Sequence, residues 1–296
     1  MNSIAANPTF NTDCSQSPIT VNGSAPSGSV QNNLNVICGN SADPVRPFVG
    51  FGDINSLENV ANSSYHALQV SVRRSKGPLV LSLAYTYSHS IDDSSDRFDT
   101  TFVNSYNLAA NRASSNFDQR HLLNISYVYS IPSFHAGGWK REAIGGWELS
   151  GITSFQTGTP FSVTFPLDNA GVANALGSGS YPDLVGDPHS SALNVPGITG
   201  PQLYNPAAFA APQGLTFGTA GRNSLNLPHR TNFDMGLFKN FVIHEAMSLE
   251  FRAEAFNIFN HTQWESIDGS FADNTFLHPA SAHTPRILQF GLKFLF

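Results

Sequence analysis

The chain has little charge, little cysteine and no long apolar run, and each shortage excludes a class of protein. Only 12% of its 296 residues are charged, which is about half the share usual in soluble domains. The net charge of −6 argues against a nucleic-acid partner, because phosphate binding needs a basic surface. No run approaches the roughly 18 apolar residues of a membrane helix. The first thirty residues lack the basic and apolar regions of a signal peptide.

The two cysteines, Cys14 and Cys38, both lie in a polar opening segment rich in Gly, Ser and Asn. No CxxC or Cys/His zinc spacing is present, and a chain of this length can bury a core without a disulfide bond. Two interpretations therefore stay open. The cysteines are either unrelated thiols or one disulfide that closes a loop in an oxidising compartment.

Sequence motifs for catalysis are also missing. The segment "HEAMS" begins like a zinc-protease helix, but Ser248 stands where the second His ligand is required. No G-x-S-x-G nucleophile elbow occurs, and the ten histidines are scattered without an obvious pair at ligand spacing. We therefore expect neither an enzyme nor a bound cofactor.

One acidic segment, "DDSSDRFD", is a candidate site for a metal ion. It gathers Asp92, Asp93, Asp96 and Asp99 in an expected external loop, but it lacks the Gly and the closing Glu of an EF-hand loop. We interpret it as a solvated acidic loop, with a weak calcium site as the alternative.

What the sequence does contain is period-two alternation of apolar and polar residues, which predicts half-exposed β-strands. Leu79, Leu81 and Leu83, for example, alternate with smaller or more polar neighbours. Seven such segments occur, and no helical period of comparable length competes with them. They span residues 68–73, 79–88, 121–132, 147–155, 232–237, 247–256 and 286–296.

The connections between these segments alternate between short or moderate and long. The long ones are residues 88–120, 166–229 and 258–285, so all long connections leave one end of the sheet. Transmembrane barrels sort their connections in this way, with short periplasmic turns and long external loops. The sequence therefore predicts an all-β fold, a transmembrane antiparallel up-and-down β-barrel with about seven strands.

The last segment, "RILQFGLKFLF", predicts a strand with one lipid-facing side that ends at the periplasmic rim. Its outward set is Leu288, Phe290, Leu292, Phe294 and Phe296. Aromatic residues favour the two membrane interfaces. The residues suited to such girdles are Tyr85, Tyr87, Tyr127, Tyr129, Trp147 and Phe294.

Several stretches, in this order, resemble the C-terminal barrel of TonB-dependent outer-membrane receptors, in particular the Oar-like subgroup. They are "SSYHALQVSVRR", "LAYTYSHSIDDSS", "NFDQRHLLNISYVYSIP", "GGWELSGITSFQTGTPFSV", "YPDLVGDP", "YNPAAFAAP", "FGTAGRNSL", "FDMGLFKNF", "LEFRAEAFNIFNHTQW" and "PRILQFGLKFLF". The resemblance implies the C-terminal barrel portion of a receptor in the bacterial outer membrane that imports a scarce nutrient, such as a siderophore or a glycan. It also implies that the barrel-assembly machinery reads the terminal aromatic residue.

The chain departs from that family in what it lacks. We find no signal peptide, TonB-binding segment or plug, and about seven strands stand against the roughly 22 of plugged transporters. Seven strands leave two open edges, which hydrocarbon does not tolerate. We therefore expect a fragment or truncated product of a larger receptor. Residues 1–60 are assigned to an external loop segment that carries both cysteines, and residues 61–296 to the C-terminal barrel strands.

The expected partners follow from this assignment. They are outer-membrane lipid, the missing plug and remaining barrel strands of the parent receptor, the assembly machinery, and the TonB complex through the absent N-terminal part. The alternative function is a surface-exposed or soluble β adhesin or glycan-binding module, which the Asn-, Ser- and Gly-rich loops support.

Overall fold

A computed structural model describes most of the chain. The described residues are 12–13, 20–21, 58–96, 99, 103, 107–132, 145–166, 180–189, 196–198, 200–213, 216–244 and 247–296. In the opening segment β1 (Thr12–Asp13) pairs antiparallel with β2 (Thr20–Val21). Cys14 and Cys38 lie outside the described residues, so their pairing stays a prediction, as does the division of the chain at residue 60.

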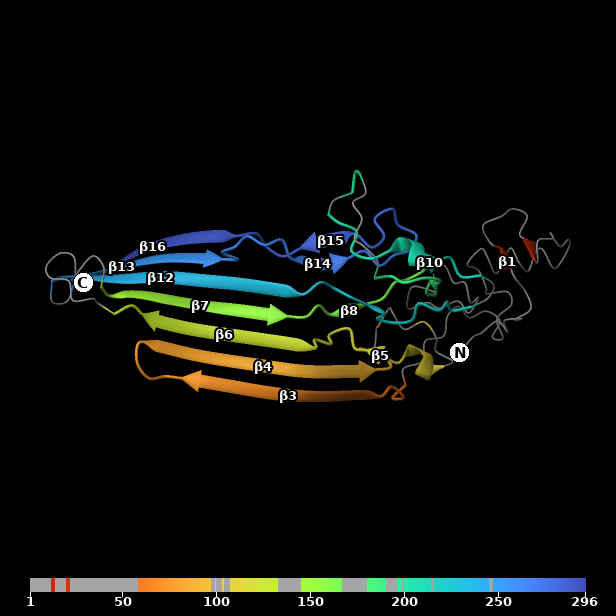
Figure 1. Ribbon diagram of the computed structural model, residues 1–296, viewed down its shortest axis with the longest axis horizontal. Helices are drawn as coiled ribbons and strands as arrows, with labels where there is room; N and C mark the ends of the chain where they lie inside the picture. Colours follow the sequence, from red (N-terminus) through yellow and green to blue (C-terminus); the bar gives the residue numbers. More distant parts are fainter. Residues whose placement is uncertain are drawn as a thin grey trace.

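Seven long strands form one antiparallel up-and-down sheet, in which each strand pairs with the next long strand along the chain (Figure 1). This confirms the predicted all-β class and all seven predicted strands. The strands, in the order of the sheet, are β3 (Ser63–Arg74), β4 (Leu79–Asp92), β6 (His121–Ser130), β7 (Trp147–Gln156), β12 (Arg230–His244), β13 (Met247–Phe256) and β16 (Ile287–Leu295). The two-residue β5 (Ala113–Ser114) adds to the end of β4.

The long connections gather at one end of the sheet and the short ones at the other (Figure 1). Where the structure describes them, the long connections contain small paired strands and two 3-10 helices. The pairs are β8 (Pro160–Phe161) with β11 (Leu225–Asn226), β9 (Asp183–Leu184) with β10 (Phe209–Ala210), and β14 (Trp264–Ile267) with β15 (Pro279–Ala282). The helices are η2 (Leu108–Asn111) and η3 (Pro206–Ala208). No helix in the described part of the chain has the length and hydropathy that a membrane span requires.

The register of the sheet places the alternating apolar positions predicted for the seven strands on one face. Directly paired residues of neighbouring strands share a face, and side chains alternate between faces along each strand. Large apolar side chains on this outward face are exposed, for example Phe290 at 70% and Leu292 at 68%. One continuous row across the outward face runs Leu81, Tyr127, Gly151, Met235, Ala255 and Leu288.

Gly151 shows why this row contains a residue without a side chain. A Cβ at Gly151 would lie 2.5 Å from the Tyr127 hydroxyl oxygen and 2.9 Å from the backbone oxygen of Asp234. The Tyr127 ring therefore lies over the glycine of its cross-strand partner. The gap in the apolar pattern of β7 is filled from β6.

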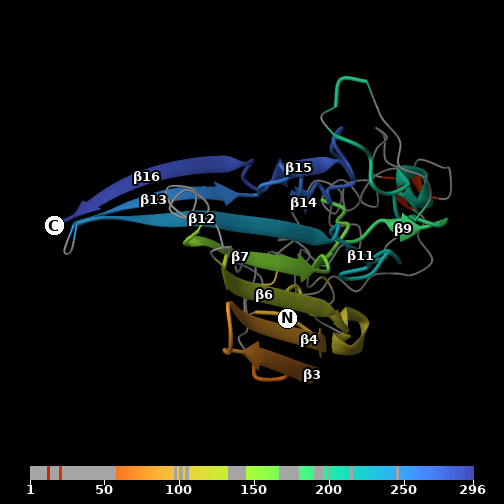
Figure 2. The same cartoon turned by 60° about the vertical axis from the view of Figure 1, so that its left-hand side comes forward.

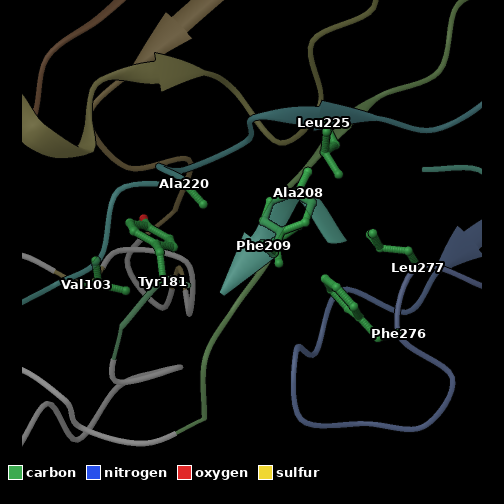
Figure 3. Packing of buried hydrophobic residues seen from close by; sticks show 9 residues of the cluster. Val103, Tyr181, Ala208, Phe209, Ala220, Leu225, Phe276 and Leu277 are labelled. Atoms are coloured by element: carbon green, nitrogen blue, oxygen red, sulfur yellow. The ribbon is translucent and has the colours of Figure 1, made fainter. Parts of the chain in front are cut away.

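The buried apolar core lies among the long connections and not behind the sheet. Figure 3 shows Tyr181, Phe209, Leu225, Phe276 and Leu277 converging there from segments far apart in the chain. Because apolar burial in water drives this packing, the external end folds like a small water-soluble domain. The sheet, in contrast, keeps its apolar side chains exposed for lipid.

The two edges of the sheet are β3 and β16, which lie far apart in Figures 1 and 2. Within the described residues no ladder joins them, so the sheet does not close on itself.

Replacing Leu292 with Lys should destabilise membrane insertion far more than replacing Gln289 with Lys. Leu292 faces outward near the middle of β16, where a lysine in hydrocarbon costs about 2–4 kcal/mol, whereas Gln289 lies on the polar face opposite Glu254. The measurement is outer-membrane yield of the full-length protein that carries each change. Equal yields would mean that β16 has no lipid-facing side.

Candidate functional site

The polar face of the sheet collects the strand carboxylates. None of the outward-facing positions of the seven long strands is Asp or Glu. The charged residues on the opposite, inward face include Glu148, Asp234, Glu250, Arg252, Glu254 and Lys293. This sorting fits an outward face that meets lipid and an inward face that meets water.

Charges on the inward face are partly paired. The Arg252 Nε atom lies 2.5 Å from Glu250 Oε1 on the same strand, and Lys293 is the direct cross-strand partner of Glu250. The Arg252 guanidinium also lies 5.9 Å from the centre of the Phe238 ring. Ion pairing within the face accounts for Arg252 and Glu250, which is consistent with a structural role for these two charges.

A groove of about 580 Å³ crosses the inward face over the middle strands. Its floor includes apolar side chains, which is unusual on the wet side of a barrel. Ile152, on this floor, is 57% exposed. The apolar residues that line it from the inward face are Val80, Val128, Ile152, Phe238 and Phe256, and the charged residues are Arg73, Asp234 and Glu254. Such a surface can bind a partner that carries both apolar and charged groups.

The acidic segment lies in the first long connection, but its carboxylates are mostly buried and not solvated. Asp92, Asp93 and Asp99 are buried, whereas Asp96 is exposed. Arg112 Nη1 lies 3.3 Å from Asp93 Oδ1. The solvated-loop interpretation was therefore wrong for these three residues, because two arginines from elsewhere in the chain neutralise them.

Arg222 is the second of these arginines, and its side chain is 0% exposed. Its Nη2 atom lies 2.7 Å from Asp92 Oδ1 and 3.0 Å from Asp99 Oδ2. Its Nη1 group donates to the backbone oxygens of Asp92 and Asn111, each at 3.2 Å. Nη2 also donates to Ser95 Oγ at 2.7 Å. Arg222 thus supplies the positive charge that pairs with the buried carboxylates of Asp92 and Asp99.

The neighbouring Asn223 extends the same contact. Its backbone is left-handed, with φ 51°, which Asn tolerates better than most residues. The side-chain amide donates to Ser114 O and to Asn116 Oδ1, both at 2.7 Å. Through these hydrogen bonds and ion pairs, Arg222 and Asn223 join the connection between β7 and β12 to the connection between β4 and β6.

The described residues contain no group of three or more His, Cys, Asp or Glu that could hold a metal ion.

Close to Arg222, burial raises the pKa of Tyr181, and the positive charge of Arg222 partly offsets this rise. Tyr181 therefore stays neutral in the core of the external end.

Arg222 was missed by the sequence reasoning because a lone arginine in a long loop carries no pattern of its own. The available signal was indirect. The acidic segment holds four carboxylates within eight residues, and buried carboxylates require positive partners. The segment that contains Arg222, "FGTAGRNSL", carries no signal of its own besides its resemblance to the receptor family.

The proposed assembly residues at the C-terminus lie on the outward face of β16. Leu288, Phe290, Leu292 and Phe294 pair directly with outward residues of β13. The rings of Phe294 and Phe296 stack at 5.9 Å, and Phe296 is 91% exposed. The terminal aromatic is thus accessible, and its reading by the assembly machinery stays a prediction.

Replacing Arg222 with Met should loosen the external end, because Asp92 and Asp99 would be left buried without their partner. Breaking a buried ion pair in this way costs about 3–5 kcal/mol. Hydrogen exchange of the backbone amides of residues 107–118 should then become faster. The comparison variant is Arg112→Gln, which should have a smaller effect, because the Arg112 side chain is 45% exposed and Asp93 keeps its hydrogen bond from Asn62 N.

A triple variant separates charge from packing in this test. Adding Asp92→Asn and Asp99→Asn to Arg222→Met removes the unpaired charges and should restore part of the protection. Unchanged exchange in Arg222→Met would contradict the fastening role of this arginine.

Comparison with known proteins gives one match. The family described as outer membrane beta barrel domain matches residues 9–289. No curated protein and no solved structure matches the chain.

Proposed function

Because the chain belongs to the outer membrane beta barrel domain family and lies in the bacterial outer membrane, we propose that it forms the C-terminal barrel portion of a TonB-dependent receptor. The receptor would import a scarce nutrient such as a siderophore or a glycan. The observation that carries this proposal is the sheet itself, with its apolar outward face, its grooved polar inward face and its two edges, which no ladder between described residues joins.

The edges support a larger barrel. Backbone groups in hydrocarbon must find partners within the protein, and β3 and β16 each have one side that no strand of the described residues pairs with. The remaining strands of the parent receptor would pair with these two edges. A barrel wide enough for a plug needs roughly 22 strands, of which this chain contributes seven.

The inward groove supports a plug. Its apolar floor and its charges suit a folded protein segment better than an empty aqueous channel. In a water-filled channel, the exposed apolar side chains of Ile152 and Phe256 would face water without a partner to pack against. We assign the plug to that groove. The TonB complex would then act through the N-terminal part of the receptor, and the assembly machinery through Phe296.

A pair of photo-reactive residues tests this proposal. Ile152 lies on the inward face of β7 and Met235 on the outward face of the neighbouring β12, so the two positions share one depth. A photo-reactive amino acid at position 152 should crosslink to a plug segment of the receptor in intact outer membranes. At position 235 it should crosslink to lipid.

Mass spectrometry of the crosslinked peptides identifies the partner. If position 152 captures only lipid or remains unreacted while position 235 captures lipid, the groove holds no plug. The adhesin interpretation would then be preferred over the receptor.

A further inference from the structure

At the end of the sheet that carries the long loops, the outward face finishes in basic and imidazole side chains. His66 of β3 and His89 of β4 are direct cross-strand partners. His121 of β6 is paired with Tyr87. Arg286 precedes β16 and shares its alternation with the outward-facing Leu288. We call His66, His89, Arg120, His121 and Arg286 the external basic rim.

Arg120 is held in a fixed position within this rim. Its Nη2 atom lies 2.7 Å from His89 Nε2, and its Nε donates to Asp118 Oδ2 at 2.8 Å. A guanidinium can only donate hydrogen bonds, so His89 Nε2 accepts this one. Asp118 is buried and also accepts from Ser90 N. Asp118 thus holds the guanidinium from the protein side.

Both arginines keep donor groups for an outside partner. The Arg120 side chain is 42% exposed, and no hydrogen bond within the described part of the chain occupies its Nη1 group. Arg286 is exposed and donates through Nη1 to Ile258 O at 3.4 Å. No carboxylate of the described residues lies within ion-pair distance of Arg286.

Aromatic side chains on the same face mark the depth of the rim. The His121 ring lies 5.0 Å from the Tyr87 ring, and its Nδ1 lies 2.9 Å from the Tyr85 hydroxyl. Towards β13 the girdle continues with Phe155, Phe233 and Phe259, whose successive ring centres lie 5.6 and 4.9 Å apart. Such aromatic belts sit at the level of lipid headgroups. The rim adjoins this belt at its external end.

We propose that the external basic rim binds phosphate groups of the outer-leaflet lipids. Arginine suits phosphate because its planar donors can engage two oxygens at once. None of the outward positions of the seven long strands is an Asp or Glu that would repel phosphate. His89 and Asp118 act as positioning residues for Arg120. The proposal goes beyond nutrient import and holds whether or not the chain transports anything.

The test uses the full-length protein extracted from bacterial outer membranes in mild detergent. Native mass spectrometry would follow its titration with a bis-phosphorylated disaccharide lipid and with the same lipid after phosphate removal. The wild-type protein should prefer the phosphorylated form. In Arg120→Gln/Arg286→Gln that preference should weaken by roughly fivefold for each arginine removed, the effect of one basic residue at an anionic surface.

The matched control removes two charges from the periplasmic end, in Arg74→Gln/Lys76→Gln. It should keep the outer-leaflet lipid that co-purifies with the protein, whereas the rim variant should lose it. Arg120→Lys/Arg286→Lys should restore part of the binding. If the double rim variant fails to insert, Arg286→Gln alone serves, because its only side-chain hydrogen bond in the described residues is to Ile258 O.

Equal binding of the phosphorylated and phosphate-free lipids by the wild-type protein would overturn the proposal. Equal retention of phosphorylated lipid by the wild-type and rim variants would overturn it as well.

Discussion

The structure depends on one constraint, the need to pair every backbone polar group of a segment that crosses hydrocarbon. The antiparallel ladder from β3 to β16 meets it for the five interior strands. The ladder must also keep one register throughout, since a slip by one residue would turn a strand's apolar set from lipid towards water. The row from Leu81 to Leu288 shows one shared register across the outward face from β4 to β16, and the shift between Val242 and His244 lies at the end of β12, beyond this row. Side-chain packing adapts to this register, because the Tyr127 ring lies over Gly151, its direct cross-strand partner.

Beyond the membrane the chain buries its apolar side chains, whereas within the membrane it exposes them to lipid. The long connections bury apolar side chains such as Leu225 and Leu277, and they also bury a charge network around Arg222. A buried arginine persists only with paired carboxylates and satisfied donors, and here Asp92, Asp99 and backbone oxygens provide them. The external end is therefore built as one packed unit that joins two connections distant in sequence. The sheet positions this unit, and the unit holds the strand ends together.

The sequence was sufficient for the strands and not for the contacts between loops. Alternation in "LVLSLAYTYS" or "ILQFGLKFL" specifies a strand and its outward face, because both depend on neighbouring residues. The unit around Arg222 depends on contacts between residues more than a hundred positions apart, such as the ion pair of Arg222 and Asp92. No local sequence pattern predicts such a contact. For the same reason the acidic segment was interpreted as solvated. The open edges at β3 and β16 were expected from the strand count, but the groove on the inward face was not.

The central claim is that β13 and β16 alternate between lipid and water in one shared register. Spin labels at single cysteines, placed one at a time at positions 249–252 and 291–294 in a protein without Cys14 and Cys38, measure this directly. Collision with oxygen should be high and collision with a water-soluble nickel chelate low at Phe251 and Leu292, which are direct partners. The reverse should hold at Glu250 and Lys293. Accessibility without a period of two, or with Phe251 and Leu292 out of phase, would contradict the claim.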